Sequence, residues 1–130
     1  MATYLARIRV YAGKEAEFEA VARTMYAATQ LEVRCRQYQY WRAAEERCYY
    51  TFAAFDDYDA FLDHQISEHH ESADFGPLIE DFSLEWLDAV PGASEIATTQ
   101  SFELSSDAPA TKRRHQGMLP LVLQAWWPRP

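Results

Sequence analysis

The sequence predicts an α+β protein of the ferredoxin-like type, with the element order β-α-β-β-α-β around one antiparallel sheet. Three observations predict this class. Side chains alternate in character along four short segments, which is typical of strands. Apolar residues recur at helical spacing after the first segment, and an acidic, histidine-rich helical stretch separates the third segment from the fourth.

The first strand and helix follow directly from periodicity. Residues 3–11 alternate and are rich in strand-forming residues, so we expect a strand there. A turn at Gly13 leads into a helix that we expect to end at about Gln30. Its apolar stripe includes Phe18 and Met25, which lie seven residues apart and therefore share one helix face.

Two tyrosine-rich segments, residues 35–42 and 47–55, predict a hairpin closed by the loop 43–46. A symmetric hairpin would pair Arg42 with Arg47. In that register Cys35 is opposite Ala54 and far from Cys48, so free thiols are expected at both cysteines.

The second half of the body contains two helical segments and a strand. Asp56 or Asp57 can cap a helix over residues 57–65, and Ser67 can cap a second one over residues 67–74. Gly76 and Pro77 then interrupt the helical pattern. Alternation returns over residues 82–90, which we expect to form the last strand.

We expect a ferredoxin-like domain over residues 1–91 and a C-terminal extension over residues 92–130. Residues 95–104 could add an edge strand, and the basic run 112–114 is interpreted as a solvated turn. The sequence ends in GMLPLVLQAWWPRP, which is strongly apolar. Such a segment is expected to dock on the body or on a partner subunit.

The hairpin register divides the side chains between two faces of the sheet. One face carries Tyr38, Tyr40, Tyr49, Thr51, Ala53 and Phe55. The other carries Gln37, Gln39, Trp41, Cys48, Tyr50, Phe52 and Ala54. Helices cover only one side in this topology, so an aromatic second face needs a cover. A homodimer packed sheet to sheet is expected, with the C-terminal extension as the alternative cover.

Composition excludes several partners. The net charge of −8 makes nucleic acid an unfavourable partner. No apolar run approaches the roughly 20 residues that span a bilayer, so no membrane partner is expected. The first residues lack the apolar core of a signal peptide, and the expected location is cytoplasmic.

The sequence resembles the antibiotic biosynthesis monooxygenase-like proteins, a family that includes quinol monooxygenases. The resemblance rests on YLARIRVYAGKEAEFEAV, CRQYQYWR, FDDYDAFLDH and HQISEHH and covers about residues 3–90. It implies a dimeric α+β barrel. Several positions depart from the family pattern: Glu68 replaces a proline, His70 an aromatic residue and Ala53 an acidic residue, and the turn before Cys35 lacks the usual glycine.

The resemblance also implies a site inside each protomer, between the sheet and the helices. The family's histidine positions fall on His64 and His69, which become candidate general bases. The substrate-binding candidates are Tyr38, Tyr40, Tyr49 and Thr51. The implied reaction is cofactor-independent oxidation of a quinol, or of another phenolic or polycyclic aromatic substrate, by O2.

Other readings of the same residues remain open. A metal site could use His64, His69 and His70, with Glu71 or Asp63. However, a five-residue spacing rotates two ligands by about 140° on a continuous helix, so no metal is expected unless a break at Ser67 restores the geometry.

The remaining alternatives concern function. Haem degradation is disfavoured because arginines dominate the first strand, and no nucleotide or flavin motif is present. A non-catalytic small-molecule-binding dimer is one alternative. Another is an isomerase or cyclase of an aromatic biosynthetic pathway, which would use the same histidine base without O2.

Overall fold

The computed structural model describes residues 1–128 of the chain. The elements are β1 (Ala2–Val10), α1 (Glu15–Thr29), β2 (Cys35–Arg42), β3 (Cys48–Phe55), α2 (Tyr58–Ile66), α3 (Glu68–Glu71), β4 (Ile79–Leu87) and α4 (Ala110–Met118). The predicted β-α-β-β-α-β order is confirmed for the body, with the second helical region broken into α2 and α3.

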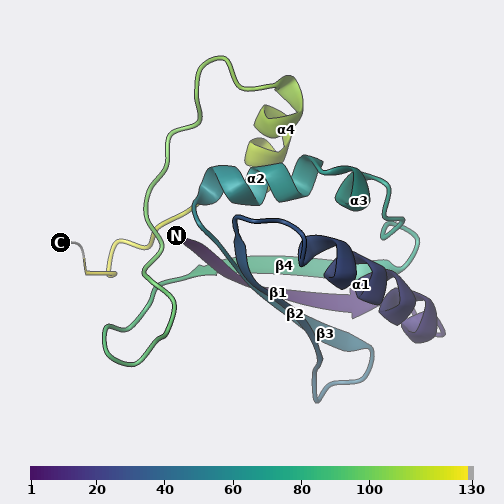
Figure 1. The fold of residues 1–130 in the computed structure, drawn as a ribbon. Coiled ribbons are helices and arrows are strands. Elements are labelled where there is room, and N and C mark those ends of the chain that lie inside the picture. The colour runs from purple at the N-terminus through teal and green to yellow at the C-terminus, as the bar shows by residue number, and fades with distance from the viewer. Residues whose placement is uncertain (129–130) are drawn as a thin grey trace.

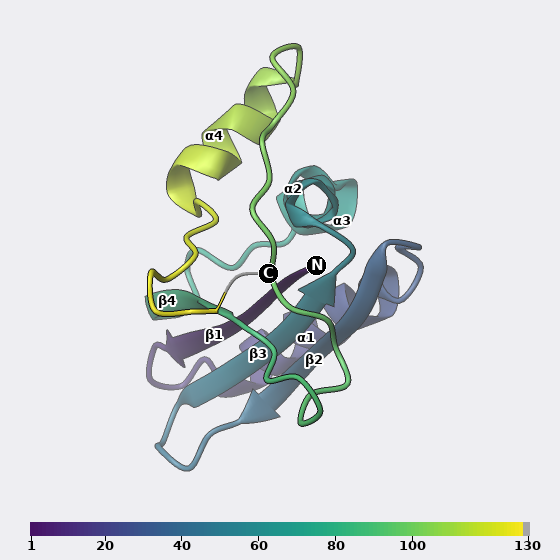
Figure 2. The same cartoon turned by 90° about the vertical axis from the view of Figure 1, so that its left-hand side faces the viewer.

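The four strands form one antiparallel sheet in the order β2-β3-β1-β4. Helices α1, α2 and α3 cover one face of this sheet, and α4 lies on the outer side of α2 (Figure 1). The view in Figure 2 shows α4 standing beyond the α2–α3 layer. In the described part of the chain, no helix combines the length and the apolar character needed to cross a bilayer.

The expected β2–β3 register is wrong by two residues. Arg42 pairs with Tyr49, and Trp41 pairs with Tyr50. The loop is longer than expected because Arg47, at a φ of 62°, still belongs to the turn. From Gln37 to Arg42 the even shift keeps each side chain on its face, so Tyr38 and Thr51 are buried on the helix side as expected. At the start of β2 an irregularity before Gln37 pairs Cys35 with Phe55 instead of the expected Ala54. Both cysteines are free, also as expected.

Strand β4 begins at Ile79, three residues earlier than the alternation indicated. The cause is pairing with β1, which a bulge between Arg9 and Val10 extends to Ile79. The expected edge strand over residues 95–104 is not regular β-structure. Instead, the buried hydroxyl of Thr99 accepts a hydrogen bond from the Thr3 amide at 3.1 Å, and this segment crosses the end of the sheet.

Aromatic rings fill the core between β1, β4 and α2. The ring of Phe61 lies 5.4 Å from Tyr4 and 5.1 Å from Trp86, in edge-to-face geometry. Tyr58 and Phe55 pack against Phe61 from two further sides. Offset and edge-to-face contacts of this kind add roughly 0.5–1.5 kcal/mol per pair to the free energy of burial.

The C-terminal extension contacts this aromatic core of its own chain. Trp86 Nε1 donates a hydrogen bond to the Pro120 carbonyl at 2.8 Å, and the Tyr58 hydroxyl donates to the Leu119 carbonyl at 2.7 Å. Buried Trp and Tyr side chains need such partners for their polar atoms. The main chain of the extension therefore satisfies two polar groups of the body.

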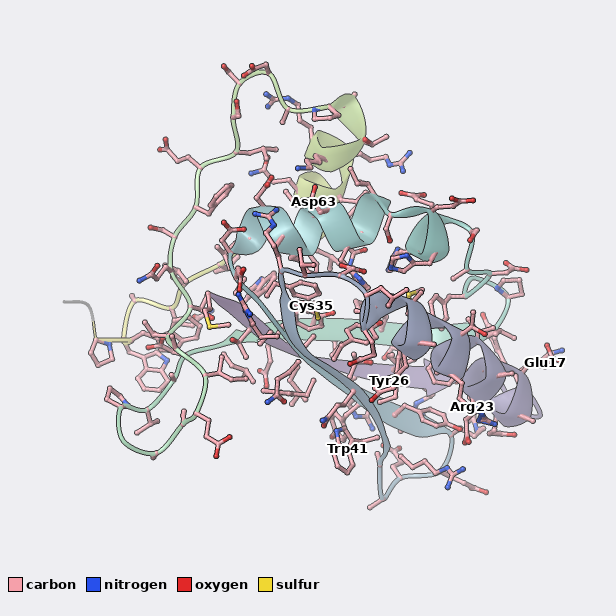
Figure 3. The ribbon with its side chains drawn as sticks, viewed as in Figure 1. Glu17, Arg23, Tyr26, Cys35, Trp41 and Asp63 are labelled. Carbon is pink, nitrogen blue, oxygen red and sulfur yellow. The ribbon has the colours of Figure 1, made fainter. Side chains whose placement is uncertain are left out.

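The basic run 112–114 is not the solvated turn that we expected, because it lies within α4. Lys112 is 13% exposed and its Nζ lies 2.8 Å from Asp59 and 2.7 Å from Asp63 of α2. Asp63 lies at the contact between α2 and α4 (Figure 3). Lys112 is largely buried because it lies on the face of α4 that packs against α2. Which residues lie on that face depends on where α4 begins.

We expect Lys112→Ala to lower the free energy of unfolding by about 1–2 kcal/mol, since it removes a largely buried cation shared by two carboxylates. Arg114→Ala is the matched control: Arg114 is 59% exposed and 3.5 Å from Glu71, and its loss should cost less than about 0.5 kcal/mol. Urea unfolding of both variants measures the difference. Equal losses would contradict the proposed role of Lys112 in docking α4.

Candidate functional site

A cavity of about 210 Å³ lies between the sheet and the α2–α3 layer. Most of its wall is apolar and comes from β1, β4 and the extension. The side chains in the wall that carry polar groups are Tyr4, Tyr38, Tyr40, Thr51, His64, Gln65 and His70. A mainly apolar enclosure with a few convergent polar groups is the usual form of a small-molecule site.

The structure places four of the six predicted site residues on this cavity: Tyr38, Tyr40, Thr51 and His64. Tyr49 does not reach it. Tyr49 lines a different cleft, between α1 and β2, and its hydroxyl donates to Glu19 at 2.7 Å. His69 does not line the cavity either, although it contacts the same carboxylate as His64, as described below.

The cleft beside α1 is larger, about 910 Å³, but its charged groups are satisfied. Glu19 accepts hydrogen bonds from Arg42 at 2.6 and 3.0 Å and from Tyr49. These bonds, first from Arg42 and then from Tyr49, lower the pKa of Glu19 to about 2. Glu19 is therefore a paired, ionised carboxylate, and within residues 1–128 no histidine lines this cleft. His64 and His70 line the smaller cavity instead.

A break in the helix at Ser67 brings His64 and His69 together. Ser67 has extended backbone angles, φ −63° and ψ 153°, and its hydroxyl accepts from the His70 amide while donating to the His64 carbonyl at 2.6 Å. It thus ends α2 and caps α3 at once. The two imidazoles, which diverge on a continuous helix, now have ring centroids 5.8 Å apart.

Both imidazoles meet the carboxylate of Glu32, in the turn between α1 and β2. Oε2 of Glu32 lies 2.7 Å from His64 Nδ1 and 2.6 Å from His69 Nε2. Because an ionised carboxylate only accepts, Nδ1 of His64 must be the donor. In the neutral ring, Nε2 then keeps its lone pair.

Glu32 is ionised in this arrangement. Burial disfavours its charge, but the hydrogen bonds from His64, followed by those from His69, help to outweigh burial and lower its pKa. His64 itself is 1% exposed. Sequence reasoning missed Glu32, because its turn carries no motif and its partners lie more than 30 positions away.

The tyrosines and Thr51 provide hydroxyl groups on the sheet side. The hydroxyls of Tyr38 and Tyr40 are 2.7 Å apart. Burial raises the pKa of Tyr38 well above its usual value and that of Tyr40 to about 12, so both stay protonated. The hydroxyl of Thr51 is buried and has no hydrogen-bond partner among the described residues. An unpaired buried hydroxyl beside a cavity is satisfied by a polar ligand atom or by water.

His70 lines the cavity, and sequence reasoning considered it only as a possible metal ligand. Its ring lies 5.0 Å from that of His64 and 6.4 Å from that of His115, so all four histidines form one continuous group. Burial, and then the neighbouring imidazoles His64 and His115, lower the pKa of His70 to about 4. His70 is therefore neutral near neutral pH.

Comparison with known proteins agrees with this geometry. The sequence model of the antibiotic biosynthesis monooxygenase family matches residues 1–74. The chain therefore belongs to the antibiotic biosynthesis monooxygenase family, as its resemblance implied. A search of curated proteins gave no significant match.

Solved structures with the same fold come from several bacteria. A Caulobacter crescentus protein, with a proposed role as an antibiotic biosynthesis monooxygenase, is 30% identical, with a TM-score of 0.64 over 68% of this chain and 89% of its own. The Rv0793 protein of Mycobacterium tuberculosis is 22% identical, with a TM-score of 0.65 over 72% and 98%. PA3566 of Pseudomonas aeruginosa is 23% identical, with a TM-score of 0.63 over 68% and 93%. These matches leave nearly a third of the present chain without a counterpart.

We expect stability to fall on acidification because of His70. Its pKa is about 4 in the folded protein and 6.5 in an unfolded chain. Between pH 6.5 and 4, His70 is protonated in the unfolded chain and neutral in the folded protein. The free energy of unfolding therefore decreases as pH falls through this range. His70→Gln should flatten this slope by up to about 1.4 kcal/mol per pH unit.

Urea unfolding of both proteins at several pH values measures that slope. His64, His69, His115 and Glu71 all face His70, and they remain in the variant. The difference between the two curves therefore reports the loss of the His70 imidazole together with its interactions with these neighbours. Parallel curves from pH 6.5 to 4 would show that His70 does not titrate as described.

Proposed function

We propose that this protein is a cofactor-independent monooxygenase that oxidises a small quinol or related phenol with O2. The observation that carries the proposal is the orientation of His64. Its ring borders the cavity, and Glu32 holds the Nδ1 proton, so Nε2 is available as a base. This arrangement matches the general pattern of a base oriented by a third group. Family membership supports the class of reaction.

The reaction begins with proton transfer from the phenolic hydroxyl to His64 Nε2. The resulting phenolate gives electrons to O2, a carbon–oxygen bond forms, and a hydroperoxide results. Loss of water breaks the oxygen–oxygen bond and leaves a carbonyl. For a quinol the products are a hydroxyquinone and one water. All four electrons gained by O2 come from the substrate, so the balance needs no other reductant.

The hydroxyls on the sheet would stabilise the negative charge that develops on the substrate. Tyr38 and Tyr40 remain protonated, and one hydroxyl of the pair is free to donate beyond their mutual bond. Thr51 has a hydroxyl without a partner beside the same space. Donors fixed before reaction act strongly because they need no reorganisation.

Cavity size supports a single-ring substrate. A cavity of about 150 Å³ holds benzene, so about 210 Å³ accommodates one ring with its hydroxyl groups. Leu119 of the extension closes part of the wall. A polycyclic substrate would need the extension to move, and we therefore favour the smaller quinols.

The expected loss of activity in His64→Ala is about 10²–10⁴-fold in kcat, the usual contribution of a positioned base. Oxygen uptake with a panel of substituted hydroquinones measures it. Unchanged rates in His64→Ala would contradict the role of this histidine. Product formed without O2 would instead favour the isomerase or cyclase alternative, and binding without turnover would favour a non-catalytic binder.

Tyr38 and Tyr49 provide a matched control for that experiment. Tyr38→Phe removes a hydroxyl from the cavity, and we expect it to slow oxygen uptake. Tyr49→Phe removes a hydroxyl from the cleft beside α1, where it contacts Glu19, and we expect it to leave the rate unchanged. If Tyr49→Phe slowed oxygen uptake and Tyr38→Phe did not, the substrate site would lie in the cleft beside α1 instead.

We also propose a homodimer that buries the open face of the sheet. On this face Leu5 pairs with Phe52, and Tyr50 pairs with Trp41. Trp41 is 58% exposed and projects away from the helices (Figure 3). An apolar strip of this kind is typical of an interaction surface. The two free thiols fit a reducing compartment, and we propose the cytoplasm.

Light scattering during gel filtration should give twice the 15.1 kDa mass of the chain. Trp41→Glu places a charge in the proposed interface and should shift the protein toward monomer. Trp126→Glu is the control, since Trp126 is 80% exposed outside the sheet, and it should leave the mass unchanged. A monomeric wild-type protein would contradict the dimer.

A further inference from the structure

The Glu32–His64–His69 trio forms a compact set of three potential metal ligands. Glu32 Oε2, His64 Nδ1 and His69 Nε2 all lie within 4.8 Å of one another. They come from three elements: the turn after α1, the end of α2, and α3. No metal was expected from the sequence unless a break at Ser67 restored the geometry, and Glu32 was not among the ligands considered there. The structure contains that break and adds Glu32 to the set.

We propose that this trio binds one divalent transition-metal ion, with Zn²⁺ as the best fit, and that binding reverses the tautomer of His64. Two imidazole nitrogens and one carboxylate oxygen are a donor set suited to Zn²⁺, Co²⁺ and related ions. Mg²⁺ and Ca²⁺ prefer oxygen ligands throughout and should not compete.

The distances require side-chain adjustments of two kinds. Zinc takes nitrogen at about 2.0–2.1 Å and a carboxylate oxygen at about 2.0–2.2 Å, so neighbouring ligands in a tetrahedron lie about 3.3 Å apart. The two nitrogens are now 2.7 and 2.6 Å from Oε2, so each of these contacts must lengthen by about 0.6–0.7 Å as the ion replaces the two bridging protons. The two nitrogens lie within 4.8 Å of each other, and they must approach to about 3.3 Å through rotation of the His64 and His69 side chains.

An entry path exists on the outer side of the trio. The side chains of His69 and Glu32 are 25% and 20% exposed, whereas His64 is 1% exposed. An ion can therefore reach the site from solvent without passing through the cavity. Three protein ligands also leave a fourth position for water, as in open zinc sites.

Metal binding and base catalysis by His64 exclude each other. A metal bound to Nδ1 uses the lone pair of that atom, so the proton of the neutral ring must lie on Nε2. The cavity then faces an N–H donor in place of a base. This consequence for activity rests on the proposed function, whereas metal binding and the tautomer change do not.

Metal binding is tested on tag-free protein after chelation, with Co²⁺ as a visible probe and Zn²⁺ as competitor. We expect one ion per chain and tetrahedral Co²⁺ absorption. Glu32→Gln keeps a hydrogen-bond acceptor but loses the charged ligand, and His69→Ala removes a ligand outside the cavity. Each should weaken binding by more than about 100-fold, beyond the effect of losing an outer-shell partner.

His115→Gln is the control for non-specific binding to histidine. His115 is buried and contacts Glu71, outside the trio, and its replacement should leave affinity unchanged. Absence of stoichiometric binding in the wild type would overturn the proposal. Equal affinity in the wild type, Glu32→Gln and His69→Ala would also overturn it.

The tautomer change is read by nitrogen-15 NMR of the histidine rings, which does not depend on turnover. Zn²⁺ should move the His64 proton from Nδ1 to Nε2 and, in an active protein, abolish oxygen uptake. A bound ion with an unchanged tautomer overturns this part of the proposal. If the metal-free protein oxidises no quinol, the proposed function fails, while the NMR result still decides the tautomer.

Discussion

The carboxylate of Glu32 joins three parts of the chain that are separate in sequence. It accepts hydrogen bonds from two imidazoles, and one of these, His64, is almost fully buried. Without that acceptor, Nδ1 of His64 would be a buried donor without a partner, at a cost of about 1–3 kcal/mol. The same bond determines which nitrogen faces the cavity. The stability of this part of the fold and the proposed role of His64 as a base therefore both depend on the contact between Glu32 and His64.

The C-terminal extension also contributes both to the packing of the body and to the wall of the cavity. Its main chain accepts hydrogen bonds from Tyr58 and Trp86, and Leu119 contributes to the cavity wall. The solved relatives have no counterpart for nearly a third of this chain. The extension therefore contributes both to the stability of the body and to the shape of the cavity.

Much of the fold follows from local patterns, because alternation and helical spacing identify strands and helices directly. The faces of β2 and β3 were predicted correctly despite a register error, since a shift of two residues preserves the side. Helix α4, with the sequence ATKRRHQGM, was missed because it lacks an apolar stripe, and Lys112 and His115 join it to α2 and α3 through carboxylates instead. His64 was placed through resemblance to a family, whereas Glu32 and His70 depend on long-range packing and on the break at Ser67. No local pattern encodes that geometry.

A crystal structure of the protein soaked with a single-ring phenol tests the central claim most directly. The account predicts that the ring occupies the cavity between the sheet and α2, with its hydroxyl within about 3.2 Å of His64 Nε2. The Nδ1 side of the ring should remain bonded to Glu32. A phenol bound in the cleft between α1 and β2, away from His64, would contradict the account.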